Sequence, residues 1–408
     1  MKLLQINSVI NTGSTGRIAE EIGQKALALG WESYIAYGRE NNRPSDSKKI
    51  RIGNDLDIKL HGLRTRIFDN HSLGQASRLA TKKLVSEIEK ISPDIIHLHN
   101  LHGYYLNIEA LFDYLRTSST PVVWTLHDCW AFTGHCTYFE LANCNKWQTH
   151  CHHCPISNKY PASYLIDRSK KNFSEKRELF TSLKNLTLIP VSHWLKNLIQ
   201  KSFLKSIPTS VIYNGIDTQI FKPYFEQVLQ KKYNLNDKFI LLGVASEWSV
   251  RKGLEDYIKL SKELDNDHQI VLIGLSQKQI RELPDNIIGI EKTENVVELA
   301  QYYSDADLIL NISYVESFGL TTVEGFACGT PGIVYNATAS PELIDKSTGM
   351  IVEKGNIAEL VSAINQMRET GKSYFSEACI NRVKNHFDKE KQYQDYFDLY
   401  NRLINNRN

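Results

Sequence analysis

The chain has 408 residues, of which 42% are hydrophobic and 23% charged; we expect two globular domains and exclude disorder, collagen and coiled coil as the main architecture. The net charge of +2 hides an asymmetry, because residues 1–216 carry 27 Lys and Arg against 18 Asp and Glu, whereas the remainder carries 21 against 28. The basic half is therefore expected to meet an anionic partner.

Short apolar runs alternate with amphipathic helical segments in both halves of the chain. In the first half we expect helices at 18–29 and 76–91 and strands at 3–6, 32–37, 95–98, 121–126, 186–191 and 210–213. In the second half, strands separated by helices are expected at 239–244, 269–273, 287–290, 308–312 and 332–335. This alternation predicts parallel sheets and two doubly wound α/β domains.

The polar stretch 227–237 lies near the expected domain boundary. We assign residues 1–216 to the first domain and 217–388 to the second, and expect the aromatic-rich tail 389–408 to be helical and to pack back on the first domain. The segment 129–161 breaks the alternation and is expected to be an insertion after a strand.

No apolar run reaches the ~18 residues of a membrane span, and the N-terminus lacks the apolar region of a signal peptide. With seven cysteines, an odd number, these features lead us to expect a cytoplasmic protein.

Two carboxylates, Glu316 and Glu324, flank an expected loop-to-helix junction. A helix beginning near Leu320 would direct free backbone N–H groups at an anion. The segment could therefore hold a phosphorylated sugar, with the carboxylates on its hydroxyls. Two solvated carboxylates beside a helix start would give the same pattern.

This segment, continued by Gly329-Thr330-Pro331, resembles the E-x7-E signature of the retaining group 4 glycosyltransferases of the GT-B fold. Other segments are similar to motifs of this family in the same order: the glycine loop 13–16, the histidine motif 125–128, the junction segment 214–221 and the basic motif 251–253. The insertion that follows the histidine motif is similar to that of colanic-acid-type glycosyltransferases.

The resemblance implies two Rossmann-like domains that face a cleft, with a nucleoside-diphosphate (NDP) sugar held by the second. Glu324 would bind the ribose hydroxyls, and Glu316 would contact the donor sugar near its reacting carbon. Further donor contacts would come from Gly16 of the glycine loop and from the backbone of Phe318, Gly319 and Leu320. Arg251 and Lys252 would contact the diphosphate, and His127 would contact the sugar. The resemblance implies catalytic roles for His127, Glu316, Arg251 and Lys252.

Two cations and a helix N-terminus can stabilise a leaving diphosphate without a metal. We therefore expect that catalysis requires no cofactor. The chain departs from the family at Ser246, where many members have an arginine that contacts phosphate. Arg17 could replace that contact, and Arg251 and Lys252 remain the main expected cations.

The residues His99, Asn100 and His102 follow the strand expected at 95–98. Ligands of doubly wound sheets bind at the carboxyl ends of strands, so these residues could contact the sugar acceptor. Packing and loop hydrogen bonds would explain the same residues equally well.

The expected insertion contains a cysteine cluster, Cys136, Cys144, Cys151 and Cys154. Four thiolates can close a tetrahedral structural zinc site. The C-x2-C spacing of the last pair is typical of such sites, and the wider spacing of the first pair is not. Free or redox-active thiols are a second interpretation, and disulfides are a third.

A basic region follows the insertion: Arg168, Lys170, Lys171, Lys176 and Arg177. It precedes an expected helix at 194–205, which carries both apolar residues and lysines. Together they could rest on an anionic membrane. The alternative is a helix packed on its own sheet.

We expect a retaining glycosyltransferase, peripheral at the inner face of the membrane. It would transfer sugar from an NDP-sugar to a saccharide or lipid-diphosphate-saccharide acceptor during surface polysaccharide assembly. An NAD-dependent sugar dehydrogenase or epimerase is disfavoured, because the glycine loop lacks the G-x-G-x-x-G spacing. A non-catalytic, zinc-stabilised sugar- or nucleotide-binding protein is the other alternative. No nucleic acid partner is expected, because no recognition module is found.

Overall fold

The computed structural model describes residues 1–39 and 43–406, and its contacts divide the chain into two units. The N-terminal unit comprises residues 1–212 together with the chain from Tyr393 onward, and the C-terminal unit comprises 213–392. The sequence placed the corresponding boundaries at 216/217 and 388/389. The last two residues of the predicted tail lie outside the described residues.

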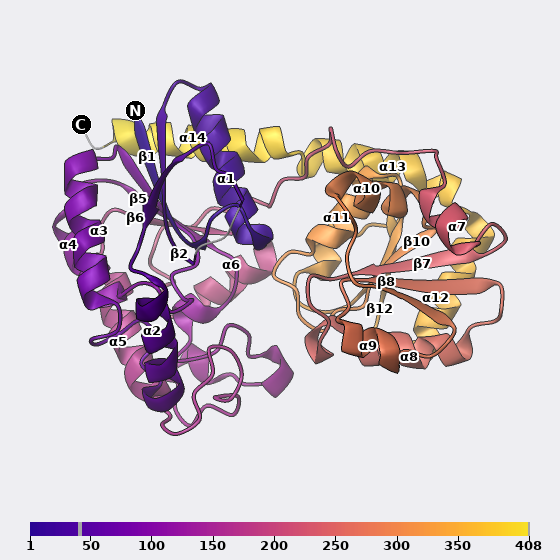
Figure 1. Cartoon of the computed structure of the whole chain (residues 1–408), viewed down its shortest axis with the longest axis horizontal. Helices are drawn as coiled ribbons and strands as arrows, with labels where there is room; N and C mark the ends of the chain where they lie inside the picture. Colours follow the sequence, from indigo (N-terminus) through magenta and orange to yellow (C-terminus); the bar gives the residue numbers. More distant parts are fainter. Residues whose placement is uncertain (40–42, 407–408) are drawn as a thin grey trace. The chain divides into compact units, whose positions relative to one another are not determined.

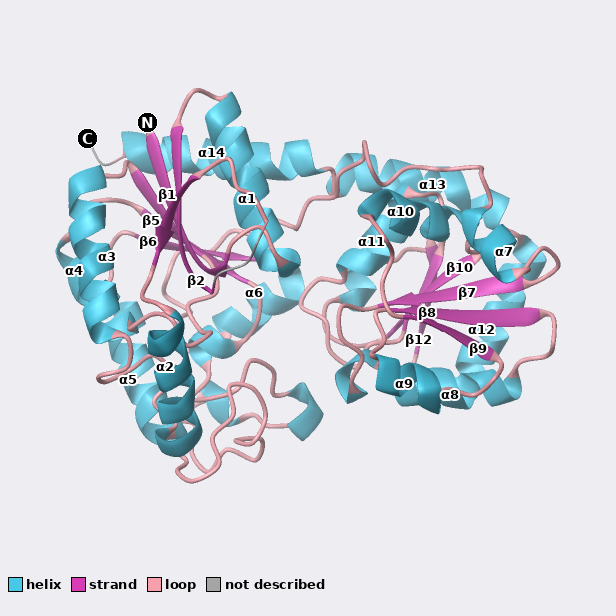
Figure 2. Cartoon of the chain, in the orientation of Figure 1, coloured by secondary structure: helices cyan, strands magenta, loops and turns pink. Residues whose placement is uncertain are grey.

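The N-terminal unit is built on a parallel sheet with the strand order β3-β2-β1-β4-β5-β6. Its strands are β1 Lys2–Val9, β2 Glu32–Arg39, β3 Lys48–Arg51, β4 Ile95–Leu98, β5 Val122–Leu126 and β6 Leu186–Pro190. Its helices are α1 Gly13–Ala28, α2 Asp55–Phe68, α3 Arg78–Ile91, α4 Ile108–Thr117, α5 Ser169–Thr181, α6 His193–Gln200 and α14 Lys389–Asn405. Figure 2 shows the long, mostly irregular segment between β5 and α5.

The two faces of this sheet are covered by different helices, because successive strand residues point to opposite faces. Val123 belongs to a core cluster with Tyr396 and Tyr400 of α14 and with residues of α1. Its neighbour Trp124 instead packs on Phe112 of α4 and Phe180 of α5, with ring centroids 6.0 and 4.8 Å away. The sheet is therefore doubly wound.

The helix α14 lies along the N-terminal unit, although it follows the whole C-terminal unit in sequence (Figure 1). Tyr400 shares a 2.7 Å hydrogen bond with Nδ1 of the buried His97. The hydroxyl of Tyr396 pairs with that of Thr125 on β5 at 2.9 Å. The core of this unit is thus completed by the end of the chain.

The C-terminal unit has a second parallel sheet, in the order β12-β11-β10-β7-β8-β9. Its strands are β7 Phe239–Val244, β8 His268–Ile273, β9 Ile287–Ile290, β10 Leu308–Asn311, β11 Gly332–Tyr335 and β12 Gly349–Val352. Its helices are α7 Val228–Tyr233, α8 Leu254–Glu263, α9 Gln277–Glu282, α10 Val296–Asp305, α11 Leu320–Ala327, α12 Ile357–Thr370 and α13 Lys372–His386. The predicted class, two doubly wound Rossmann-like α/β domains, is confirmed.

One predicted strand is wrong. Residues 210–213 form no strand, and the only ladder contact nearby in the described chain is an isolated bridge between Leu188 and Thr209. This segment leads out of the N-terminal unit, so it has no sheet neighbour along its length. The apolar character of residues 210–213 instead serves packing, since Ile212 belongs to the core that contains α14.

Candidate functional site

In the C-terminal sheet the strand order reverses between β7 and β10. The chain runs outward through β7, β8 and β9 and then crosses to β10 on the other side of β7. Loops that leave the carboxyl ends of strands at such a switch point diverge and create a ligand crevice. The loop after β7 contains Arg251 and Lys252, and the loop after β10 contains Glu316. The fold thus brings together predicted residues that are 64 positions apart.

Glu316 is a buried carboxylate held between two cations. The ammonium of Lys252 donates to its Oε1, and these two side chains are only 15% and 9% exposed. The guanidinium of Arg251 donates to the carbonyl of Val315 at 3.1 Å. Burial raises the pKa of Glu316, but Lys252 and Arg251 outweigh this effect and hold the pKa below its ordinary value. Glu316 is therefore ionised at neutral pH.

Close approach between the two loops depends on Gly253. Its φ is +75°, and a Cβ atom there would overlap the carbonyl oxygen of Ile312 just after β10. A side chain at this position would be strained in conformation and would push the loops apart. Gly253 therefore helps to place Lys252 beside Glu316.

The helix α11 begins at Leu320, directly after the Glu316 loop. Its N-cap residue is Gly319, with φ +105°. Glycine has no side chain, so the first N–H groups of the helix donate no hydrogen bond to an N-cap side chain in the described chain. The ring of Phe318 packs between those of Tyr213 and Phe387, with centroids 5.7 Å from each. The helix start therefore offers backbone donors to an anion.

Glu324 lies one turn inside α11 and is also buried, at 7% exposure. It accepts a 2.9 Å hydrogen bond at Oε2 from the hydroxyl of Tyr303 on α10. This contact holds the carboxylate in one orientation. The second carboxylate of the predicted motif is thus a buried group and not a solvated one.

In the N-terminal sheet the strand order reverses between β1 and β4. Gly16 lies in the first turn of α1 after β1, and a Cβ atom there would approach the side chain of Val9 to 3.1 Å and the backbone N of Asn11 to 3.2 Å. The residues after β4 include His99 and His102, and His127 follows β5. These predicted residues therefore lie at or beside the switch point of this unit.

His99, Asn100, His102 and His127 line one small cavity, shared with the aromatic residues Trp124 and Trp130 and with Asp128. Nδ1 of His99 lies 3.4 Å from Nε2 of His127, and its Nε2 pairs with Oε1 of Gln5 at 3.0 Å. Burial lowers the pKa of His127 to about 4, and burial holds the pKa of His99 well below its ordinary value. Both rings are therefore neutral at pH 7 and can exchange hydrogen bonds with hydroxyl groups.

Several contacts of these residues were not predicted. His102 pairs through Nε2 with Oδ2 of Asp128 at 2.8 Å and through Nδ1 with the hydroxyl of Tyr160 at 3.0 Å. In the other unit, the backbone N of Glu316 donates to the hydroxyl of Thr338 at 2.8 Å. Of these partners only Asp128 had a sequence signal, its place in the histidine motif.

The four cysteines of the predicted cluster line a single small cavity in the insertion. All four are free thiols, so the disulfide interpretation is not supported. The side chains of Cys136 and Cys154 are hydrogen-bonded to each other. Sγ of Cys151 accepts a bond from the backbone N of Gly134 at 3.2 Å, but burial outweighs this bond and raises the pKa of the thiol to about 11. Four thiols are a donor set of the kind that structural zinc uses, but in the described residues they do not form a group of ligand atoms within 4.8 Å of one another.

A different set of ligand atoms already lies within 4.8 Å of one another in the described part of the chain: Asp69, His71 and His135. Oδ1 of Asp69 accepts from Nδ1 of His135 at 2.7 Å and from Nε2 of His71 at 2.9 Å. The remaining His71 nitrogen accepts from the indole of Trp130 at 3.3 Å, and Oδ2 of Asp69 accepts from the backbone N of Arg168 at 2.7 Å. These bonds satisfy the cluster without a metal and tie the irregular segment to the unit.

The predicted basic surface is partly wrong. Lys176 is fully buried, and its ammonium donates to the carbonyls of Trp130 at 2.8 Å and Thr133 at 3.1 Å. In α6, Leu195 and Ile199 are buried, because this helix packs on β6. The apolar side of that helix is therefore not available to a membrane.

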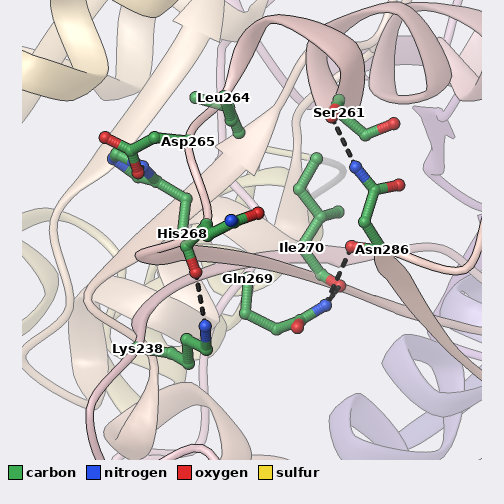
Figure 3. A pocket seen from close by; sticks show the side chains of 9 residues that line it. Lys238, Ser261, Leu264, Asp265, His268, Gln269, Ile270 and Asn286 are labelled. Atoms are coloured by element: carbon green, nitrogen blue, oxygen red, sulfur yellow. Dashed lines mark hydrogen bonds and ion pairs between the residues drawn. The ribbon is translucent and has the colours of Figure 1, made fainter.

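A larger pocket occurs in the C-terminal unit beside Lys238, Asp265, His268, Gln269 and Asn286 (Figure 3). It lies by the amino ends of β7 and β8, opposite to the end where ligands of such sheets bind. Most of its polar groups are bonded to neighbours: Gln269 donates to the carbonyl of Asn286 at 3.0 Å, and Nδ1 of His268 pairs with Asp265 at 2.6 Å, whereas Nε2 of His268 has no partner in the described residues. We therefore assign no function to it.

None of the helices in the described residues has the length and apolar character that crossing a membrane demands.

Comparisons with known proteins agree with this geometry. Residues 15–220 match the family described as Glycosyltransferase Family 4, and residues 225–386 match the family described as Glycosyl transferases group 1. The chain is 23% identical to WcaC of Escherichia coli K12, named as a colanic acid biosynthesis glycosyl transferase, over 88% of this chain and 89% of that protein. It is 26% identical to the O-antigen biosynthesis glycosyltransferase WclY of Escherichia coli, over 50% and 58%.

Solved structures share the fold. Sucrose-phosphate synthase of Thermosynechococcus elongatus superposes with a TM-score of 0.73 at 18% identity, covering 99% of both chains. HepE of Anabaena, solved in complex with UDP, superposes with a TM-score of 0.69 at 15% identity, covering 98% of this chain and 99% of that one.

Proposed function

Because the chain belongs to the family 4 glycosyltransferases of the GT-B fold, we propose that it is a retaining enzyme that transfers a sugar from an NDP-sugar. The acceptor is a saccharide or a lipid-linked saccharide in surface polysaccharide assembly, as the names of WcaC and WclY suggest. A uridine nucleotide is the first donor to test, because HepE was solved with UDP and with UDP-glucose. The observation that carries the proposal is the buried Lys252–Glu316 pair beside the start of α11.

The donor binds at the switch point of the C-terminal unit. Lys252 and Arg251 neutralise the diphosphate, and the first N–H groups of α11 bind phosphate or sugar oxygen. Glu324 binds the ribose hydroxyls, and Glu316 contacts the donor sugar. These contacts stabilise the charge that develops on the departing diphosphate, so the transfer needs no divalent metal. The leaving phosphate itself accepts the proton of the acceptor hydroxyl, which makes a paired acid and nucleophile unnecessary.

The acceptor side is the cavity beside His99, Asn100, His102 and His127 in the N-terminal unit. Neutral imidazoles in a buried, aromatic-lined site suit sugar hydroxyls better than anions. His127 hydrogen-bonds sugar in this scheme, and Gly16 lets backbone approach the substrate closely. The enzyme works in the cytoplasm, at the inner face of the membrane, where lipid-linked acceptors are presented.

The proposal is tested by donor binding and product analysis together. UDP-, GDP- and ADP-sugars are screened for thermal stabilisation, since a ligand that binds only the native state raises its stability. The product of the best donor is then examined by NMR for the configuration of the transferred sugar. Inversion would overturn the retaining mechanism, and nucleotide binding without any transfer would favour a non-catalytic binding protein.

Glu324→Ala should weaken nucleotide binding by about 1.5–3 kcal/mol, because it removes a charge-assisted hydrogen bond. Isothermal titration with UDP measures this effect. The matched control is Glu377→Ala, an exposed carboxylate on α13 of the same unit. Equal UDP affinity in both variants would contradict the ribose-binding role of Glu324.

We further propose that Cys136, Cys144, Cys151 and Cys154 hold one structural zinc ion that stabilises the insertion. The purified protein should contain about one equivalent of zinc by elemental analysis, and Cys151→Ser should lose both the metal and thermal stability. Cys379→Ser, at a buried cysteine of α13 outside the cluster, should keep the metal. A metal-free protein with an unchanged melting temperature in Cys151→Ser would leave only the free-thiol interpretation.

A further inference from the structure

The helix α2 is oriented with its apolar side outward. Leu56, Leu60 and Leu63 recur at intervals of four and three, so they form one stripe along the helix, and they are 49–63% exposed. The buried residues of this helix are instead His61, Gly62 and Thr65. A surface helix ordinarily buries its apolar stripe and exposes its polar one.

This orientation is imposed by specific contacts on the inner side. Nδ1 of His61 pairs with the hydroxyl of Ser77 at 2.8 Å, and its Nε2 accepts from the backbone N of Ser72 at 3.2 Å. The start of the helix is fixed by a capping box between Asn54 and Asp57. Rotating the leucines inward would break these bonds and bury a charged flank, so the outward stripe is a stable property of the unit.

A neighbouring loop extends the apolar surface. The backbone N of Tyr164 donates to the carbonyl of Arg66 in the last turn of α2, at 2.8 Å. Tyr164, Leu165 and Ile166 are 45–74% exposed. Single exposed apolar residues are common, but a group of six on one helix and its adjoining loop indicates an interaction surface.

Cations border this surface. At about 100° of rotation per residue, Lys59 and Arg64 flank the leucine stripe on opposite sides. Neither forms an ion pair within the part of the chain that the structure describes. The acidic residues of the helix are engaged at its start, Asp55 with Arg51 and Asp57 in the capping box. An apolar stripe between free cations is the pattern of a helix that lies in the interface of an anionic bilayer.

We propose that α2 and the loop 160–166, here called the α2 surface, dock this protein on an anionic lipid bilayer. The leucines and the loop side chains enter the boundary between headgroups and acyl chains, while Lys59 and Arg64 meet lipid phosphates. The α2 surface replaces the α6 region that the sequence suggested, where the apolar residues are buried. The proposal rests on the proposed function only for its purpose, which is access to a lipid-linked acceptor.

The test is co-sedimentation of the full chain with vesicles of phosphatidylcholine alone and of phosphatidylcholine mixed with phosphatidylglycerol. Binding should require the anionic lipid and fall at high salt. The combined change Leu56→Gln, Leu60→Gln and Leu63→Gln should reduce vesicle binding about tenfold or more, because glutamine keeps helix propensity but removes the apolar stripe. Lys59→Glu with Arg64→Glu should reduce it further at low salt.

The matched control is Val297→Gln with Tyr374→Gln, at exposed apolar positions of the C-terminal unit, and it should bind vesicles like the parent. Circular dichroism and UDP binding confirm that each variant is folded, so a failure of docking is distinguished from a failure of the donor site. Unchanged vesicle binding by the folded triple-glutamine variant would overturn the proposal. The proposal would also be overturned if the parent protein self-associated without binding vesicles and the triple-glutamine variant did not self-associate. The α2 surface would then be a contact between copies of the chain.

Discussion

Replacing Lys252 by alanine should lower kcat/KM of the proposed sugar transfer about 100–1,000-fold, the usual effect of removing one group that stabilises developing charge. The ammonium is paired with Glu316 in a largely buried setting, so the substitution removes a cation and also leaves a carboxylate without its partner. The pKa of Glu316 should then rise, because Lys252 is the leading cause that opposes the effect of burial. Steady-state kinetics with the best NDP-sugar measures the loss.

Two comparisons make this result specific. Lys252→Arg keeps the charge and should retain more activity than the alanine variant. Lys278→Ala removes an exposed lysine of α9, whose pairing with Glu282 spans 3.8 Å at the surface, and should leave kinetics unchanged because exposed pairs contribute little. Lys252→Ala with the kcat/KM of the parent and a normal melting temperature would refute the role of this lysine in donor chemistry.

Acidification should destabilise the N-terminal unit well before its carboxylates are protonated. Its buried histidines include His61, His71, His97, His99 and His127. Burial lowers the pKa of His61 to about 3 and those of His71 and His127 to about 4, and it holds the pKa values of His97 and His99 well below the ordinary range. In the unfolded chain these groups titrate near pH ~6.5.

Between the two sets of pKa values the unfolded state binds more protons than the folded state. Stability therefore falls as the pH drops below about 6.5, by up to ~1.4 kcal/mol per pH unit for each histidine. His135 offsets only part of this loss, and only above the unfolded pKa. Burial lowers the pKa of His135, but Asp69 outweighs burial and raises it. The contribution of His135 to folding stability is therefore complete below the pKa of the unfolded state and is lost as the pH rises through the pKa of the folded state. From pH 7.5 to 5.5 we expect a decrease of about 5 kcal/mol.

Urea unfolding at the two pH values measures this decrease through tryptophan fluorescence, because five of the six tryptophans belong to residues 1–212. His61→Gln should reduce the pH dependence by about one proton. His386→Gln, at an exposed position of the C-terminal unit, should not change it. Equal stability of the parent at pH 7.5 and 5.5 would show that these histidines are accessible to protons in the folded state.

Strand positions were well predicted where both faces of a strand are buried. The apolar runs 95–98, 239–244 and 332–335 coincide with β4, β7 and β11, because a buried parallel strand is a short continuous apolar run. Elements whose residues depart from this pattern were missed. The helix α2 packs through polar and small residues, so its apolar period marks the wrong face. The edge strand β12 is partly exposed, with Ile351 at 40% exposure.

The candidate site was predicted where its residues are neighbours in sequence. Glu316, Phe318, Gly319, Leu320 and Glu324 belong to one segment, and the structure places them on one loop and helix. Their partners come from elsewhere: Tyr303 is 21 positions from Glu324, and Thr338 is 22 from Glu316. Tyrosine and threonine are common residues without a distinctive spacing, so only the packing of α10 and the chain after β11 could reveal these contacts.

The position of α14 has a consequence for the order in which the protein folds during synthesis. The aromatic residues that fill the core of the N-terminal unit, Tyr393, Tyr396, Phe397 and Tyr400, are translated only after the whole C-terminal unit. A ribosome that has passed residue 212 has therefore released a sheet with one face covered only in part, by α1. The C-terminal unit, which is continuous in sequence, can reach its native state first. The nascent N-terminal sheet thus keeps part of its apolar surface exposed for longer than its early place in the chain suggests.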